Sequence, residues 1–273
     1  MKHIVCHSGG HSSALTAIEV VRRFGKENVI LVNHDVLLED ADVKRFKQEV
    51  ADFLELPITY ANMQGSDTMN QFDVVIKAEA FKVGDGQILC TNRMKTEPFM
   101  RYLKENHAEK DCVVYYGFDA TGHEMLRVQR RSSIMGSMGY KTDYPIALWQ
   151  ERTIKDVREV GIEPPLLYSK FKHANCIGCL KAGKQHWYIV YCEYPQIWQE
   201  AKRAEEQIGY SLFKDTYLVD LEPKFEAMKQ ANVPATEHIQ SQTFWKNARQ
   251  AMKESLFTLP VIDAEQLPCE CTT

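Results

Sequence analysis

The start of the chain constrains its fold more than any other stretch. An apolar run at Lys2–Cys6 leads into the segment "HSGGHSS" at residues 7–13, and apolar residues then recur at helical spacing as far as Phe24. A glycine-rich turn between a buried strand and a helix is typical of α/β proteins. We therefore expect a strand, a tight turn and a helix over Ser12–Phe24 as the first unit.

The same alternation continues along the chain. Apolar runs predict further strands at Val29–Asn33, Pro57–Tyr60, Cys112–Gly117 and Tyr144–Leu148. Helical spacing of apolar residues predicts helices at Asp40–Leu54, Lys95–Asn106, His123–Met138 and Thr153–Val160. Strands that alternate with helices predict a doubly wound α/β fold, in which a parallel sheet carries helices on both faces.

The pattern changes near Gly183, beyond which helical spacing dominates. We expect helices within 184–208, 222–231 and 240–255, followed by a loose tail that ends in "CECTT". The sequence therefore predicts an α/β domain at residues 1–182 and a helical extension with a tail at residues 183–273.

Composition limits the classes of function. The chain has 33 basic and 37 acidic residues, a net charge of −4, which gives no global attraction to nucleic acid or anionic membrane. We find no apolar segment long enough to span a bilayer and no apolar signal-peptide core, so we expect a cytoplasmic protein with no membrane partner. The chain has eight cysteines. In a reducing compartment spaced cysteines more often indicate metal or redox chemistry than disulfides.

The turn after the first strand is predicted to bind an anion. Gly9 and Gly10 can adopt backbone angles that point successive N–H groups inward, and a helix N-terminus adds partial positive charge. Ser12 or Ser13 can cap that helix, and His11 adds charge when it is protonated. The alternative is a tight glycine turn that holds no ligand.

The pattern Ser-Gly-Gly-x-x-Ser, from Ser8 to Ser13, resembles the pyrophosphate loop of the N-type ATP pyrophosphatases (PP-loop superfamily). In particular it is similar to the phosphoadenosine phosphosulfate (PAPS) reductase-like family, which includes many phage-encoded proteins. The resemblance implies an adenine nucleotide as ligand, either ATP or an adenylyl-sulfate, and Mg²⁺ with it. The usual loop is Ser-Gly-Gly-x-Asp-Ser, so Ser12 in place of the aspartate weakens the prediction of metal coordination and of full ATP cleavage.

Two further segments match the resemblance beyond the strand ends. In "NHDVLLED" it implies that Asn33, Asp35 and Glu39 touch the ribose or adenine, although acidic residues there can simply begin a helix. In "YYGFDATGHEMLRVQRR" it implies nucleotide contacts from a second set of residues, with a solvated helix face as the alternative for the arginines. That second set is Gly117, Asp119, Arg127 and Arg131. The reductases proper carry an arginine where this chain has Asp119.

A third match, "CTNRMKTEP", contains Cys90 and Lys95 at the spacing of the family. The resemblance implies that Lys95 neutralises phosphate charge. The residues alone would indicate an ordinary surface lysine.

The pair Cys176 and Cys179 in "HANCIGCLKAGKQHW" has the Cys-x-x-Cys spacing that lets two thiolates bind one metal or cluster. The resemblance supplies Cys90 as a third ligand. Three cysteines can hold an iron–sulfur cluster with one open iron, or zinc with a fourth ligand such as His173 or Cys192. The alternative is a buried pair of thiols with no metal.

Together these matches predict an adenine-nucleotide-dependent enzyme that links adenylation to sulfur transfer or thiolation. Lys95 and Arg127 would stabilise developing oxyanions, while Cys176 and Cys179 would carry sulfur from a sulfur or electron donor to an acceptor such as a nucleic-acid base. One alternative is a true sulfonucleotide reductase, whose nucleophile would be Cys271 in the tail. The other is a non-catalytic nucleotide- or metal-binding module.

Overall fold

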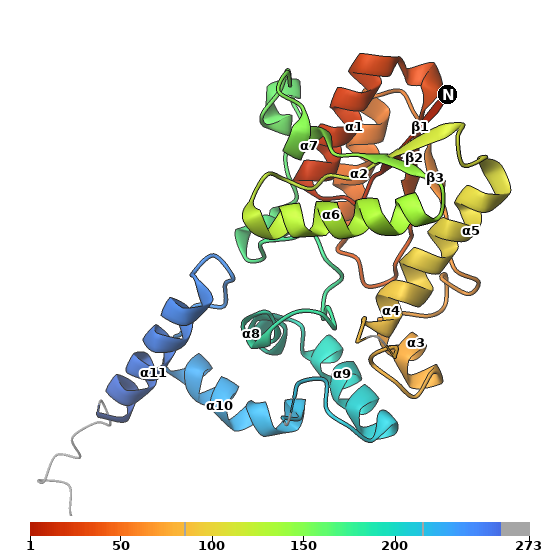
Figure 1. Ribbon diagram of the computed structural model, residues 1–273. Coiled ribbons are helices and arrows are strands. Elements are labelled where there is room, and N and C mark those ends of the chain that lie inside the picture. The colour runs from red at the N-terminus through yellow and green to blue at the C-terminus, as the bar shows by residue number, and fades with distance from the viewer. Residues whose placement is uncertain (85, 215, 258–273) are drawn as a thin grey trace, which may run out of the picture.

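The computed structural model describes residues 1–84, 86–214 and 216–257 (Figure 1). It contains a five-stranded sheet in the order β3-β2-β1-β4-β5, and every neighbouring pair is parallel. The strands are β1 (Lys2–Cys6), β2 (Val29–Asn33), β3 (Ile58–Tyr60), β4 (Cys112–Tyr115) and β5 (Lys141–Asp143). The predicted doubly wound α/β fold is thus confirmed.

Helices cover both faces of the sheet, and the alternation of side chains along β1 shows how. Val5 packs in one apolar cluster with α1 (His11–Phe24) and α2 (Ala41–Phe53). Ile4 points to the opposite face, into a cluster with α5 (Glu97–Asn106) and α6 (Gly122–Ser137). Both strand residues are fully buried, which is why the central strands are continuously apolar.

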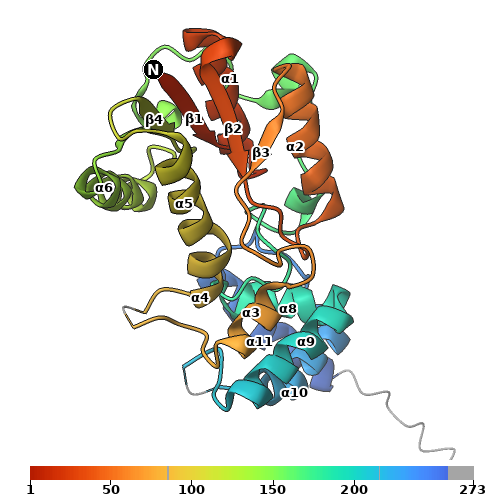
Figure 2. The same cartoon turned by 90° about the vertical axis from the view of Figure 1, so that its right-hand side faces the viewer.

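A helical lobe lies beyond the carboxyl ends of the strands (Figures 1 and 2). Its C-terminal members are α8 (Lys184–Glu193), α9 (Pro195–Ile208), α10 (Leu218–Gln230) and α11 (Ser241–Phe257). The short helices α3 (Gln71–Lys77) and α4 (Leu89–Thr91) share its apolar core, in which Phe72 meets Trp187 and Trp198. The predicted division at residue 183 stays a prediction, but the core of this lobe draws on both sides of it.

Two predicted elements are wrong, and proline is the reason in each. The predicted strand Tyr144–Leu148 is a short helix, α7 (Pro145–Leu148), and the edge strand β5 comes just before it. The predicted helix over 184–208 is two helices, because Pro195 begins α9 after a break at Tyr194. Proline has a φ suited to the first turn of a helix but no N–H to continue one.

The predicted helix at Thr153–Val160 is only a 3₁₀ turn, η3 (Val157–Val160), and a similar turn, η4 (Leu166–Ser169), follows it. None of the helices in the described ranges is long and apolar enough to cross a membrane.

Candidate functional site

The sheet order places a topological switch point between β1 and β4. The chain leaves β1 toward β2 and β3 on one side, and β4 leads to β5 on the other. Ligands of open α/β sheets bind at such a point, beyond the carboxyl ends of the strands. Here those ends point toward the helical lobe (Figure 2). We call this region of the molecule, where ligands of open α/β sheets bind, the crevice.

The segment after β1, residues 7–13, which we call the glycine turn, opens into the crevice at the switch point. Gly9 has φ 81°, and Gly10 is the extended N-cap of α1. The Ser13 hydroxyl donates to the Gly10 carbonyl oxygen at 2.7 Å, so it closes the first helical turn. Within the described residues, no acceptor takes a hydrogen bond from the amides of Ser8, Gly9, Gly10 or Ser12. The turn therefore presents unpaired N–H groups at a helix N-terminus.

Glycine is needed at two positions because neighbouring segments approach closely. A Cβ on Gly9 would lie 2.6 Å from Cγ1 of Val43, on α2. A Cβ on Gly117, just after β4, would lie 2.7 Å from the carbonyl of Ser12. Gly117 therefore lets the loop after β4 pack directly on the first turn of α1, which is a structural reason for that glycine besides the predicted nucleotide contact.

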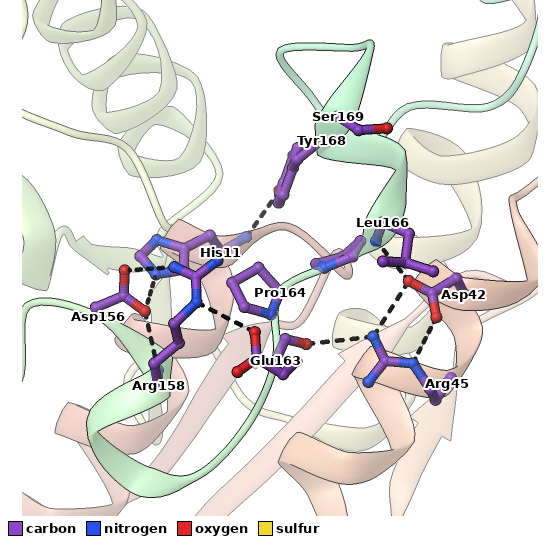
Figure 3. Close-up of a pocket in the computed structure, with 11 residues that line it drawn as sticks. His11, Asp42, Arg45, Asp156, Arg158, Glu163, Pro164, Leu166, Tyr168 and Ser169 are labelled. Carbon is purple, nitrogen blue, oxygen red and sulfur yellow. Dashed lines mark hydrogen bonds and ion pairs between the residues drawn. The ribbon is translucent and has the colours of Figure 1, made fainter.

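The His11 ring turns away from the other residues of the glycine turn. Its Nε2 accepts a hydrogen bond from the Val157 amide at 3.3 Å and lies 3.7 Å from the Asp156 carboxylate. The ring lines a cavity of about 700 Å³ beside the turn (Figure 3). Its backbone amide donates to the hydroxyl of Tyr168 at 3.0 Å. Sequence reasoning missed Tyr168, because it lies in η4, far along the chain from the turn.

The charged groups of this cavity pair with one another. Arg45 binds Asp42 at 2.5 Å, and Arg158 lies 3.1 Å from both Asp156 and Glu163 (Figure 3). Since each arginine has a carboxylate partner, the cavity wall offers an anion little net attraction. The cavity is therefore distinct in character from the glycine turn.

A buried polar network lies behind the turn. Asn33 donates from its side chain to the His7 carbonyl oxygen and accepts a hydrogen bond from Lys47 Nζ at 2.9 Å. Lys47, only 1% exposed, also forms an ion pair with Glu39, whose side chain is 8% exposed. Asn33 and Glu39 thus already have protein partners. Their predicted contacts with a nucleotide stay predictions, and Lys47 is a buried cation that helical spacing alone did not reveal.

His7 and Asp35, which also lie near the strand ends, differ in burial. His7 is fully buried and contacts the Lys47 carbonyl oxygen at 3.1 Å, and burial lowers its pKa to about 4. The His7 ring is therefore neutral at physiological pH. Asp35 lies at the surface, where its carboxylate accepts a hydrogen bond from Lys44 at 3.0 Å. Asp35 stands at the rim of the crevice.

The structure brings together thiols from two distant segments, close to Glu39 in the segment that follows β2. Cys90 precedes a π-helical turn, Asn92–Thr96, that carries Lys95, and such turns occur often at functional sites. Burial raises the pKa of Cys90 to about 12, and negative charge on Cys176 and Cys179 adds to the effect. The pKa of Lys95 is raised, chiefly by its electrostatic interaction with the neighbouring Cys176. Four predicted residues therefore lie in one group.

Residues 173–183, which we call the cysteine loop, are tied to the surrounding elements. The Ile177 amide donates to the Leu38 carbonyl oxygen at 2.9 Å, and Gln71 Nε2 donates to the Ile177 carbonyl oxygen at 2.8 Å. The Cys179 amide donates to Nε2 of the buried His186 at 3.3 Å. The loop is thus held between the segment after β2 and the helical lobe.

The three thiols of Cys90, Cys176 and Cys179, in the positions that the structure gives them, do not form a metal site. In the described part of the chain no group of three or more His, Cys, Asp or Glu side chains could hold a metal ion. An iron–sulfur cluster or zinc at Cys90, Cys176 and Cys179 stays a prediction, and no chemical step below passes through it. Cys269 and Cys271 lie outside the described residues.

The arginines of α6 lie over aromatic rings that follow β4. The guanidinium of Arg127 lies 4.3 Å from the centre of the Phe118 ring, and that of Arg131 lies 5.4 Å from the Tyr116 ring. Arg127 also pairs with Glu124 at 2.6 Å. The carboxylate of Asp119 is occupied locally, because it accepts hydrogen bonds from the amide and hydroxyl of Thr121 at 2.9 and 2.6 Å.

A cation that sequence reasoning missed joins the same group. The pKa of Lys181 is lowered, first by desolvation and also by the positive charges of Lys95 and Arg127. Three cations from the π turn, the cysteine loop and α6 therefore repel one another beside the thiols. An anion between them would relieve that repulsion.

Comparison with known proteins adds a distant relative. The chain is 24% identical over 210 residues to the uncharacterized nin region protein ORF290 of Escherichia phage lambda, and the alignment covers 68% of each protein. No protein-family model matches the chain, and no solved structure matches it. The similarity to a PAPS reductase-like family therefore rests on the motifs described above.

Proposed function

We propose that the chain is an adenine-nucleotide-dependent enzyme of the PAPS reductase-like kind, which couples adenylation of an acceptor to sulfur transfer. One observation carries the proposal: unpaired amides lie at the switch point, and three thiols are grouped with Lys95 and Lys181 near the segment that follows the neighbouring strand β2. Unpaired amides at a helix N-terminus suit a phosphate chain.

In the proposed reaction the two sides of the crevice have different tasks. An acceptor oxygen attacks the α-phosphorus of ATP, and a new O–P bond forms as the bond to the β-phosphate oxygen breaks. Pyrophosphate leaves with the additional negative charge, which the amides of the glycine turn stabilise. Lys95 and Arg127 stabilise the charge that develops on the α-phosphate oxygens.

The thiol side would supply the second step. A persulfide on Cys176, loaded by an external sulfur donor, attacks the adenylated carbon with its outer sulfur, a C–S bond forms, and AMP leaves as the C–O bond breaks. The Cys179 thiol then attacks the Cys176 sulfur, the S–S bond to the transferred sulfur breaks, and the thiolated product leaves. The Cys176–Cys179 disulfide that remains is reduced by an external electron donor. Cys90 and Cys179 have raised pKa values, whereas Cys176 is the thiol whose charge most affects Lys95. The positive charge of Lys95 would stabilise negative charge on the sulfur that is transferred.

The test is a substitution that blocks the ligand and spares the fold. Gly10 has φ −89°, and a Cβ there would meet no atom closer than the Tyr168 hydroxyl at 3.5 Å, so the backbone and Cβ of Gly10→Val fit the free protein. Its side chain would extend over the amides and should weaken binding of a non-hydrolysable ATP analogue by more than about thirtyfold, about 2 kcal/mol, in calorimetry.

Gly183→Val is the matched control. Gly183 is also an extended helix N-cap, with φ −80° and no atom within 4 Å of a Cβ. The Gly183→Val variant should bind the ATP analogue with the affinity of the wild type. Equal affinity of Gly10→Val and wild type would refute nucleotide binding at the turn, and no pyrophosphate release from ATP with any acceptor would refute the adenylation step.

A further inference from the structure

The amide of His11 lies between the unpaired amides of Gly10 and Ser12 but has a side-chain partner of its own. It is the first amide of α1, and it donates to the Tyr168 hydroxyl at 3.0 Å. Figure 3 shows the Tyr168 side chain directed at this amide. The same hydroxyl lies 3.5 Å from the position that a Cβ on Gly10 would occupy, with the Ser8 hydroxyl close by. Tyr168 therefore reaches the place where a phosphate oxygen would lie.

The hydroxyl of Tyr168 accepts a hydrogen bond from the His11 amide and lies beside the Ala174 amide. Burial raises its pKa, while the amides of His11 and Ala174 lower it. No acceptor for its own proton exists in the part of the chain that the structure describes. A hydroxyl that accepts from an amide directs its proton away from that donor, which leaves the proton for a ligand.

We propose that Tyr168 is an anion-binding and positioning residue of the crevice: its hydroxyl donates to the leaving pyrophosphate and ties the glycine turn to the cysteine loop. The inference rests on the proposed function for its ligand. The tie follows from the two amides, since His11 belongs to the turn and Ala174 lies two residues before Cys176. The neutral phenol of Tyr168 and the unpaired amides of the glycine turn together form a site that contains only hydrogen-bond donors. A phosphate, which only accepts hydrogen bonds, requires such a site.

The helical lobe fixes the tyrosine from behind. His238, between α10 and α11, contacts the carbonyl oxygen of Tyr168 with its Nε2 at 2.6 Å. The Glu237 amide donates to the Lys170 carbonyl oxygen at 2.8 Å, and the Glu237 carboxylate accepts from the Lys172 amide at 3.0 Å. The C-terminal helices therefore complete the phosphate site by holding a residue that the sheet does not supply.

The test compares Tyr168→Phe with Tyr210→Phe in the full chain. Tyr210 is a matched control in the helical lobe, because its hydroxyl also accepts a hydrogen bond from a backbone amide. The donor is the Phe81 amide, at 2.8 Å. Calorimetry with inorganic pyrophosphate should show about tenfold weaker binding for Tyr168→Phe, the usual loss for a hydrogen bond to a charged group, and unchanged binding for Tyr210→Phe. Amide exchange at His11 and Ala174 should be faster in Tyr168→Phe without ligand.

The outcomes separate this inference from the proposed function. If the wild type binds pyrophosphate and Tyr168→Phe binds it equally well or more tightly, Tyr168 is a bystander or a competitor and the inference fails, while the proposed function stands. If exchange at Ala174 does not change, the tie between turn and loop fails. If the wild type binds neither pyrophosphate nor the ATP analogue, the proposed function fails, and the ligand role of Tyr168 fails with it.

Discussion

The two sides of the crevice are built in contrasting ways. The glycine turn comes from consecutive residues, 7–13, and offers mainly backbone N–H groups. The thiol side assembles Cys90 and Lys95 with Cys176 and Cys179 from distant segments, and it offers side chains whose ionisation depends on burial. A backbone site needs space and supporting packing, whereas a side-chain site needs control of charge. The packing behind the turn is therefore the first place where the contrast can be tested.

The largest effect is expected behind the glycine turn, at Lys47. Lys47→Ala removes the partner of Glu39 and leaves a buried carboxylate without compensation. Loss of one partner of a buried ion pair costs about 3–5 kcal/mol. Urea denaturation of the variant should show a decrease of that size in the free energy of unfolding.

Lys44→Ala provides the control on the same helix. Lys44 also pairs with an acidic residue that follows β2, but its side chain is 40% exposed and that of Asp35 is 44% exposed. An exposed pair contributes at most about 1 kcal/mol. If the two variants were equally stable, the network behind the turn would not support it, and the contrast drawn above would lose its basis.

Acid should weaken the turn side next. Burial lowers the pKa values of His7 and His34 to about 4, whereas in the unfolded chain a histidine titrates near 6.5. The neutral folded form is fully favoured above pH 6.5. As the pH falls from 6.5 toward 4 the unfolded chain takes up protons first, so the free energy of unfolding decreases by up to about 1.4 kcal/mol per pH unit for each histidine.

Denaturation midpoints measured across that range check the effect. His7→Asn should remove about half of the slope that the two histidines cause. His123→Asn, at a position 87% exposed, should leave the slope unchanged. A slope that His7→Asn does not alter would mean that this ring is accessible to protons in the folded protein.

A smaller effect, at Gly9, distinguishes the cost of crowding a neighbouring side chain from the cost of backbone strain. Gly9→Ala places a side chain at φ 81° and within 2.6 Å of Val43, so we expect a loss of about 2–3 kcal/mol. Gly161 has a similar φ of 78°, and no atom lies within 4 Å of the position that a Cβ would occupy. Gly161→Ala should therefore lower the free energy of unfolding by only about 1 kcal/mol. Thermal unfolding of both variants measures the difference, and equal losses would show that close packing on α2 does not select glycine here.

The same contrast explains what could be predicted from the sequence. The parallel sheet, four of its five strands and the glycine turn followed from local patterns, because apolar runs and glycine pairs act within a few residues. The two wrong elements, at Pro145 and Pro195, also had a local cause. The prediction did not treat proline as a residue that can begin a helix. Local chemistry therefore carried most of the fold.

The remainder of the site depends on contacts between distant segments. No spacing rule could show that Lys47 is buried against Glu39, that Lys181 lies near Lys95, or that Tyr168 reaches the His11 amide. The proximity of Cys90 to Cys176 was expected only through the family resemblance. Tertiary packing decides such contacts, and sequence periodicity does not record it.

The smallest expected effect concerns the tail and separates the thiol side from a rival nucleophile. Removing residues 269–273 deletes Cys269 and Cys271 and leaves Cys90, Cys176 and Cys179 in place. If the thiols of the crevice carry the sulfur, turnover and nucleotide affinity of the truncated chain should equal those of the full chain. Loss of all turnover with nucleotide affinity retained would instead assign the nucleophile to Cys271, as in a sulfonucleotide reductase, because a cysteine of the tail would then be needed to attack the sulfate sulfur.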